Sequence, residues 1–240
     1  MSSSPNTPVA VVVGVGQGLG AALARRFAHG YRVAIVARSA DVIRATADEI
    51  GSEGGVALPV TSDATIPDQV SAAYAQICSE LGVPEVLIYN GGRRPFGTLV
   101  DTAPEVFEQT WRIHAFGAFL WARQVVPEML ARRRGAILIT GATAGVKPGP
   151  SSAAFAPAKF AVRGLAQVMS RDLHPQGIHV AYVNVDGAID MPAIRQFLPH
   201  LKDEDLLKPA AIAEAFWYLA HQDPSTWSHE LDVRPFKEKF

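Results

Sequence analysis

Short apolar runs alternate with segments of helical periodicity along the chain. The apolar runs, rich in β-branched residues, cover residues 9–13, 32–37, 56–60, 86–89, 136–140, 178–183 and 230–233. Between them, apolar positions recur every three or four residues, which predicts a helix from Leu19 to a stop at Gly30 and further helices over residues 41–50, 67–81, 104–132, 152–173 and 209–220. This alternation, with strands that are apolar throughout, predicts a doubly wound α/β fold with a mostly or wholly parallel sheet of about seven strands flanked by helices.

Four segments complete the predicted organisation. No linker, repeat or low-complexity tract divides residues 9–240, so we expect one domain there, preceded by a flexible polar leader over residues 1–8. The long helix over residues 104–132 contains Pro127, where we expect a bend. Residues 186–208 have the weakest periodicity and follow a strand end, where ligands bind in such sheets, so we expect a lid.

Composition and charge exclude several classes of protein. Of the 240 residues, 48% are hydrophobic and 19% are charged, which disfavours intrinsic disorder and a coiled-coil rod. The formal net charge is -1 and no basic stripe stands out, so we expect neither nucleic acid nor a membrane as a partner. Cys78 is the one cysteine, which excludes an intramolecular disulfide and favours a cytoplasmic location, and no Cys/His cluster has metal-ligand spacing.

A glycine-rich turn joins the first strand to the first helix. It contains Gly14, Gly16, Gly18 and Gly20, with Gln17 and Leu19 between them. Glycines permit a tight turn and close approach of a ligand, and the N–H groups at a helix N-terminus attract a pyrophosphate. The turn therefore predicts a nucleotide site, the alternative being an ordinary glycine-rich turn.

The end of the second strand bears on the choice of nucleotide. An acidic residue about 20 positions after the glycine turn would bind the ribose 2′-hydroxyl of NAD. This chain has Arg38 there instead. An arginine can pair with a 2′-phosphate, so we expect NADP in preference to NAD, unless Arg38 is only a solvated surface residue.

With these features in place, the sequence resembles the short-chain dehydrogenase/reductase family over essentially its whole length. Residues 13–20, VGVGQGLG, are similar to the family's TGxxxGxG motif, with Val13 replacing the threonine. Asp63, followed by Ala64, matches the family's aspartate beside the adenine ring, and Asn90 and Gly91 begin a segment similar to its NAG motif. The resemblance implies a Rossmann-type fold, an NADP cofactor, a small-molecule substrate, and a homodimer or homotetramer formed partly through residues 111–132 and 152–173.

The catalytic positions of the family are altered in this chain. The resemblance implies a YxxxK motif, of which only Lys159 is present, because Phe155 stands at the tyrosine position. The serine position corresponds to Ala142 and the asparagine position to His114. We expect Lys159 to bind the cofactor ribose, and His114 to be a candidate general acid because imidazole titrates near neutrality. A lysine that covers a helix face and a structural core histidine are the alternatives.

Other residues are expected around this site. Thr143 offers a hydroxyl beside the missing serine, and Tyr89 is the one tyrosine close enough to be considered as a replacement acid. Arg93 and Arg94 are expected near the substrate mouth, where they could attract an anion or be solvated loop charges. The substrate pocket is therefore expected to include Ala142, Thr143, Phe155 and Arg93.

The loop after the sixth strand also departs from the family. Members of the family usually have a Pro-Gly pair in this loop, whereas this chain has Asp186 followed by Gly187. Backbone groups of Gly187 and Ile189 are expected to contact the nicotinamide.

Three functions remain open from the sequence. The first is an NADP(H)-dependent oxidoreductase that works without the tyrosine, since hydride transfer is mostly the chemistry of the cofactor. The second is an NADP-binding protein without redox turnover, acting as a sensor or as a partner in an assembly. The third is a non-redox isomerase or dehydratase with His114 as the base.

Overall fold

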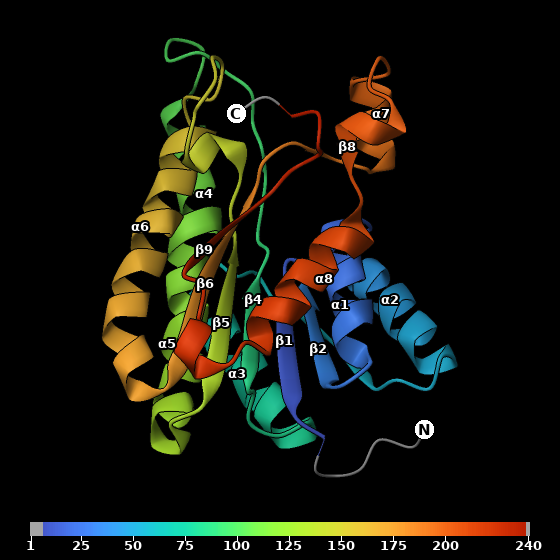
Figure 1. Cartoon of the computed structure of the whole chain (residues 1–240), viewed down its shortest axis with the longest axis vertical. Coiled ribbons are helices and arrows are strands. Elements are labelled where there is room, and N and C mark those ends of the chain that lie inside the picture. The colour runs from blue at the N-terminus through green and yellow to red at the C-terminus, as the bar shows by residue number, and fades with distance from the viewer. Residues whose placement is uncertain (1–6, 239–240) are drawn as a thin grey trace.

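The fold is built on one parallel sheet, seen in a computed structural model that describes residues 7–238 (Figure 1). Residues 1–6 of the expected leader lie outside the described residues. The strand order is β3-β2-β1-β4-β5-β6-β9, and every neighbouring pair is parallel. The strands are β1 (Val9–Val13), β2 (Arg32–Ala37), β3 (Ala57–Thr61), β4 (Val86–Tyr89), β5 (Gly135–Thr140), β6 (Ile178–Val185) and β9 (Glu230–Val233). The predicted fold class is confirmed, with seven strands in this sheet among the described residues.

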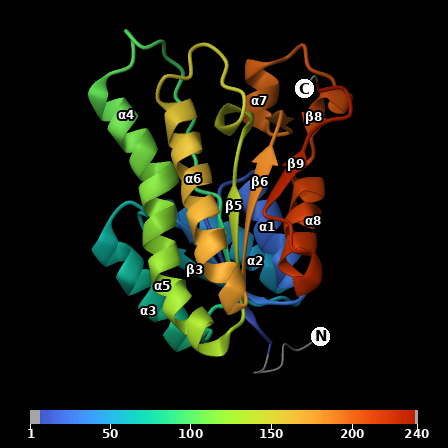
Figure 2. The same cartoon turned by 60° about the vertical axis from the view of Figure 1, so that its left-hand side comes forward.

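Helices cover both faces of the sheet (Figures 1 and 2). They are α1 (Leu19–Ala28), α2 (Ala40–Ser52) and α8 (Pro209–Ala220) on one face, and α3 (Pro67–Glu80), α4 (Pro104–Trp111), α5 (Gly117–Arg132) and α6 (Phe155–Leu173) on the other. Side chains of a strand point alternately to its two faces. Val11 therefore packs in the α3/α5/α6 layer with Trp121, whereas Val12 packs in the α1/α2/α8 layer with Leu23.

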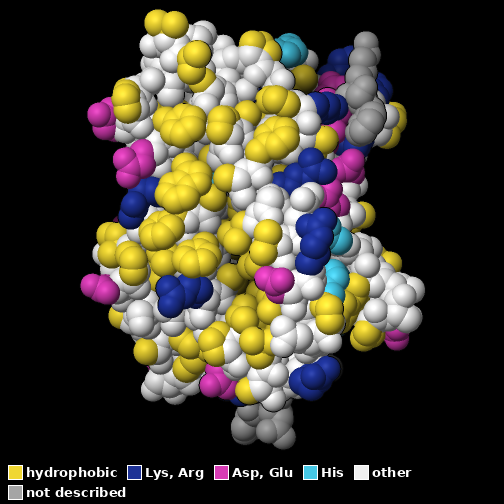
Figure 3. Space-filling view, turned by 90° about the vertical axis from the view of Figure 1, so that its left-hand side faces the viewer, with side chains coloured by type: hydrophobic (Ala, Val, Ile, Leu, Met, Phe, Trp, Pro, Cys, Tyr) yellow, Lys and Arg dark blue, Asp and Glu magenta, His cyan; other side chains and the backbone are white. Residues whose placement is uncertain are grey.

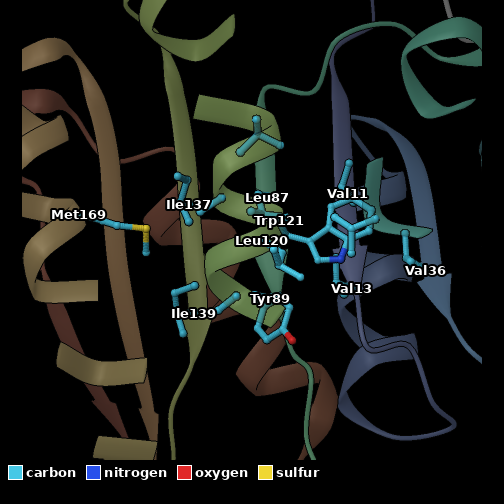
Figure 4. Close-up of a cluster of buried hydrophobic side chains, with 14 of the residues drawn as sticks. Val11, Val13, Val36, Leu87, Tyr89, Leu120, Trp121, Ile137, Ile139 and Met169 are labelled. Carbon is cyan, nitrogen blue, oxygen red and sulfur yellow. The ribbon is translucent and has the colours of Figure 1, made fainter. Parts of the chain in front are cut away.

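The central strands are apolar throughout because both of their faces are buried. All five residues of β1 and all four of β4 are buried. Figure 4 shows the layer between the sheet and α5, in which Trp121 of α5 lies beside Val11, Val13 and Leu87. This packing fixes the carboxyl ends of β1 and β4 side by side, where the strand order reverses. In open α/β sheets this reversal opens the crevice that binds ligands.

The predicted long helix over residues 104–132 is interrupted. One π-helical turn, Arg112–Phe116, separates α4 from α5, and α5 runs on through Pro127. The irregular turn thus lies more than ten residues before Pro127, and the bend expected at Pro127 stays a prediction. Such turns insert one extra residue and re-aim the side chains they carry. Here the turn carries His114, whose side chain is buried.

The expected lid has short elements of its own. Residues 186–208 contain β7 (Ala188–Ile189), α7 (Pro192–Phe197) and β8 (Leu206–Leu207), and β7 and β8 form a separate parallel pair. In Figure 1 this segment lies above α1, beyond the carboxyl ends of the strands. None of the helices within residues 7–238 is long and apolar enough to cross a membrane.

Candidate functional site

The glycine turn is fixed by close contacts between β1 and β4. Gly14 has a φ of +86°, and a Cβ there would lie 2.6 Å from the backbone oxygen of Asn90. A Cβ on Gly20 would lie 2.6 Å from the Gly14 oxygen, so both positions need glycine. The Asn90 side chain donates from Nδ2 to that same Gly14 oxygen at 3.0 Å. Asn90 thus holds the turn, which is a different task from contacting a ligand directly.

The first helix begins directly after this turn. Gly18 precedes α1, no side chain caps the helix N-terminus, and the first turn has no acidic residue. The positive end of the helix dipole is therefore available to an anion. Leu19 is buried in the core, so only its backbone can serve a ligand there. A Cβ on Gly18 would lie 2.0 Å from the sulfur of Met191, so the segment before α7 packs directly over the turn.

A cavity of about 300 Å³ opens beside the glycine turn. Of the residues predicted to bind a cofactor or substrate, its lining includes Gly14, Gly16, Arg38, Asp63, Ala64, Gly91 and Arg93. Residues that the sequence reasoning missed also line it, among them Ser39, Ser62, Thr65, Gly92 and Ile113, and so does Tyr89, the candidate for a replacement acid. Ser39 and Thr65 each follow a predicted residue closely in sequence, a signal that could have found them.

Arg38 stands at the rim of this cavity. Two thirds of its side chain is exposed, and its Nη1 lies 3.9 Å from Oδ2 of Asp63. The other oxygen of Asp63 accepts hydrogen bonds from the backbone N–H and the hydroxyl of Thr65, at 2.8 and 2.7 Å. An exposed pair at this distance contributes little to stability, so the Arg38 guanidinium can turn to another anion at small cost.

The loop after β6 is held by charges instead of a proline. Asp186 is fully buried, with Lys147 Nζ at 3.2 Å and Arg234 Nη1 at 3.6 Å from its Oδ2. Gly187 follows with a φ of +147°, and a Cβ there would lie 2.9 Å from Cδ of Pro235. Gly187 therefore packs near the C-terminal segment, Ile189 pairs with Leu207 of β8, and neither lines the cavity at the glycine turn.

Three residues predicted for catalysis or the substrate pocket meet in a buried cluster. The ring of Phe155 makes an edge contact with His114 at 5.3 Å between ring centroids, and Lys159 Nζ lies 5.8 Å from the Phe155 ring. Ala142 packs against the apolar group that contains Phe155. Thr143 begins the adjoining 3-10 turn, Thr143–Gly145. This cluster is separate from the lining of the cavity, and Arg93 connects the two through its backbone contacts to His114.

Lys159 is buried, and its ammonium group donates a hydrogen bond to the backbone at the end of β5. Its Nζ donates to the backbone oxygen of Thr140 at 2.8 Å. Burial lowers the pKa of Lys159 from its ordinary value to about 7. Near neutral pH the group therefore exchanges between its charged and neutral forms.

His114 is neutral in this environment. Burial, and after it the charge of Lys159, lowers the pKa of His114 to about 3. The expectation that this imidazole titrates near neutrality is therefore wrong. Its Nε2 lies 3.0 Å from the Arg93 oxygen, which accepts a hydrogen bond when Nε2 carries the proton. Nδ1 is then a buried acceptor without a hydrogen-bond partner among the described residues.

Tyr89 is committed to a structural hydrogen bond. Its hydroxyl donates to the backbone oxygen of Ile113 at 2.5 Å, and burial raises its pKa above the ordinary range. The ring also fills the space beside Gly91, where a Cβ would lie 2.8 Å from the phenol carbon Cζ. Tyr89 therefore shapes the cavity wall and does not replace a missing acid.

Cavity size alone does not identify the site. A larger cavity of about 960 Å³ lies near the start of β4 and β5, lined by residues that include Glu85, Val86 and Gly135. It contains none of the predicted site residues, and it lies at the amino ends of the strands. The smaller cavity lies at the carboxyl ends, where this kind of sheet binds its ligands.

Comparison with known families agrees with this geometry. The model of the short chain dehydrogenase family matches residues 8–197, from the first strand through α7. The chain belongs to the short chain dehydrogenase family. The matched part contains the glycine turn, the cavity and the buried cluster around Phe155.

Relatives cover this dehydrogenase-family chain to different extents. A short chain dehydrogenase of Pseudocercospora fijiensis is 31% identical over 70% of this chain, which spans 56% of that relative's length. The 2-(R)-hydroxypropyl-CoM dehydrogenase of Xanthobacter autotrophicus is 30% identical, over 90% of this chain and 92% of the relative. A solved structure of a metagenomic short-chain oxidoreductase in complex with NADP is 28% identical with a TM-score of 0.84, over 97% of this chain and 99% of that one.

Proposed function

We propose that this chain is an NADP(H)-dependent oxidoreductase that acts on a small molecule. The observation that carries the proposal is the glycine cradle beside a cavity with Arg38 at its rim. A Cβ at Gly14 would clash with the backbone of Asn90 and one at Gly20 with the turn itself, whereas a Cβ at Gly16 would meet nothing within 4 Å, so a ligand can approach the backbone there. The cavity volume of about 300 Å³ lies within the range of cofactor sites and suits the adenosine half.

The preference for NADP rests on the charges at the rim. Arg38 would bind the 2′-phosphate, assisted by the hydroxyl of Ser39, which makes no capping hydrogen bond to α2. Asp63 Oδ1 stays engaged with Thr65, and Oδ2 makes only a long pair of 3.9 Å with the exposed Arg38, so the guanidinium can turn outward at small cost. The N-terminus of α1 after Gly18 would hold the pyrophosphate, and Met191 would have to move its flexible end away from Gly18.

We further propose that the active site is non-standard, with Phe155, Ala142 and His114 in the places of the family's tyrosine, serine and asparagine. When bound, the cofactor would supply a hydride. Lys159 would donate an N–H to a ribose hydroxyl, since its bond to Thr140 uses one of its protons. Phe155 and Ala142 make the cluster apolar and would exclude water from the reacting carbon.

The altered residues restrict which substrates react. Phe155 has no proton to give, and the low pKa of His114 leaves its imidazole neutral. Reduction of an iminium consumes a hydride and no proton, so it balances without either residue. An activated alkene or carbonyl would take its proton from water, with a loss of about 10²–10⁴ in rate relative to a positioned acid.

A substrate screen tests this function. We expect NADPH to be oxidised with at least one imine, activated alkene or carbonyl compound, and Lys159→Met to raise the KM for NADPH. Lys208→Met, which removes an exposed lysine directly before α8, is a comparison for general effects of losing a cation. Tight NADPH binding with no turnover across the panel would contradict the oxidoreductase and favour a nucleotide-binding protein without redox activity.

We also propose that the protein is a homodimer or homotetramer through the face formed by α4, α5 and α6. Figure 3 shows hydrophobic side chains gathered on this face. Exposed large apolar residues of these helices include Phe107, Trp111, Phe119, Phe160 and Val168. A patch of this kind is typical of an interface between proteins. Light scattering should give a molar mass that is a multiple of the monomer mass, and Phe119→Glu should lower this molar mass. A monomer mass for the parent chain would refute the proposed oligomer.

A cytoplasmic location completes the proposal. It rests on the single cysteine of the sequence, Cys78, which is a free thiol. Fractionation of cells that express the tagged chain should recover it with cytoplasmic markers, and recovery from an oxidising compartment would contradict it.

A further inference from the structure

Arg94 stands between the surface and the buried cluster. Its guanidinium carbon lies 4.7 Å from the ring centroid of Phe96 and 5.8 Å from that of Phe155. On the inner side, Lys159 Nζ is 5.8 Å from the same Phe155 ring. One exposed cation and one buried cation thus approach the residue that we place at the reacting position.

The backbone holds Arg94 in this place. The Gly97 N–H donates to the Ser151 oxygen at 3.0 Å, and the Ala153 N–H donates to the Gly97 oxygen at 3.2 Å. This bridge ties the loop after β4 to the segment that leads into α6 and Phe155. Arg94 lies three residues before the bridge, so its position over Phe155 is set by two elements distant in sequence.

Arg93 and Arg94 carry positive charge that no carboxylate among the described residues neutralises in an ion pair. Within residues 7–238, no ion pair joins Arg93 or Arg94 to a carboxylate, and Arg93 donates to the neutral side chain of Gln109 at 3.2 Å. A guanidinium stacked on aromatic rings keeps its edge N–H groups for a planar carboxylate. The local excess of positive charge therefore favours an anion beside this loop.

Two exposed aromatic rings contact each other beside Arg94. Phe96 and Phe197 stack with ring centroids 5.4 Å apart, and 58% and 62% of these residues remain exposed. Phe197 ends α7 in the expected lid, whereas Phe96 belongs to the loop that carries Arg94. Their contact joins α7 to the loop after β4 and offers exposed apolar faces to a flat ligand.

We propose that this site takes a conjugated or aromatic carboxylate, with the carboxylate bound at the edge of Arg94 and the flat apolar part packed against Phe96, Phe197 and Phe155. The proposal rests on the proposed function, because it names the substrate class of that same site. Arg94 is then a residue that determines specificity. Phe155 contributes an apolar surface where a phenol would have been polar.

Calorimetric titration tests the proposal without requiring turnover. The probes are cinnamate, its neutral methyl ester, and acetate, which carries the charge without the flat apolar part. Each is titrated into the full chain with and without NADPH. A charge-assisted hydrogen bond predicts that cinnamate binds at least about tenfold more tightly than methyl cinnamate.

Variants assign the effect to the proposed residues. We expect Arg94→Ala to abolish the preference for cinnamate over its ester, and Arg94→Lys to restore part of it. Arg171→Ala is the matched control, because Arg171 lies on α6 far from Phe155 and donates only within its own helix among the contacts found. Phe96→Ala should weaken the binding of cinnamate and leave the binding of acetate unchanged.

Three results would overturn the proposal. They are no measurable binding of cinnamate, equal affinities for cinnamate and its ester, and a preference that survives in Arg94→Ala. Failure of the proposed function is a separate outcome, since it appears as absent NADPH binding or absent NADPH oxidation. The cinnamate titrations of the chain alone remain readable in that case.

Discussion

Replacing Phe155 by tyrosine tests whether this residue faces the reacting carbon. The substitution adds one hydroxyl to a ring that is 7% exposed and lies 5.8 Å from Lys159 Nζ. Taking that distance as the charge separation and an effective dielectric constant of about 20, a charged Lys159 stabilises a phenolate by about 3 kcal/mol, or about 2 pKa units. Burial raises the pKa of the phenol, so the two effects on this pKa oppose each other.

A phenol at this position can donate the proton that the native residue lacks. A positioned general acid contributes about 10²–10⁴ in rate, so Phe155→Tyr should raise kcat/KM for ketone reduction by a factor in that range. Steady-state oxidation of NADPH with a panel of ketones measures it. Iminium reduction, which needs no proton, should change little.

Two further variants make the result specific. Phe160→Tyr adds a hydroxyl to an exposed ring on the same helix and should leave the rate unchanged. Combining Phe155→Tyr with Lys159→Met should remove most of the gain. If Phe155→Tyr folds, binds NADPH as the parent does and shows no gain, residue 155 does not face the reacting carbon and our assignment of the active site is wrong.

Three further predictions concern the turn and the buried cations. Gly14→Ala, which combines a φ of +86° with a contact of 2.6 Å, should lower the melting temperature and weaken NADPH binding, whereas Gly16→Ala, which meets nothing within 4 Å, should unfold like the parent. Burial lowers the pKa of Lys159 to about 7, so above that pH the unfolded chain binds more protons than the folded chain. The free energy of unfolding should therefore rise as pH increases from 7 toward 10. Denaturant titrations at each pH measure it, and an equal rise in Lys159→Met would contradict this. By the same linkage, the pKa of about 3 at His114 predicts that stability falls as pH decreases below about 6.5, and His114→Gln should reduce that loss in acid denaturation curves.

The strands and the glycine turn could be predicted from the sequence because their signals are local. β1 is buried on both faces, so its apolar run indicates a central strand without reference to any partner. Gly20 needs its lack of a Cβ within the turn itself, and the φ of +86° at Gly14 favours glycine by its backbone conformation alone, so their spacing predicts the turn. The position of Arg38 near the glycine turn could also be predicted, because the end of the second strand lies beside the first strand in a doubly wound sheet.

The rest depends on contacts between distant parts of the chain. The π-helical turn at residues 112–116 adds one residue to a helix, which helical periodicity does not reveal. The position of Arg94 over Phe155 depends on the bridge between Gly97 and Ser152, which lie far apart in sequence. The low pKa of His114 depends on burial and on Lys159, so the residue type alone gave the wrong protonation state.

Binding of the two nicotinamide cofactors tests the central claim most directly. Calorimetric titrations of the chain with NADPH and with NADH should show tighter binding of NADPH by about tenfold or more, because a charge-assisted bond at the 2′-phosphate adds at least 1.4 kcal/mol. Arg38→Ala should abolish this preference and leave NADH affinity unchanged, since Arg38 is exposed at the rim of the cavity. Failure to bind either cofactor, or an NADPH preference that persists in Arg38→Ala, would contradict the account.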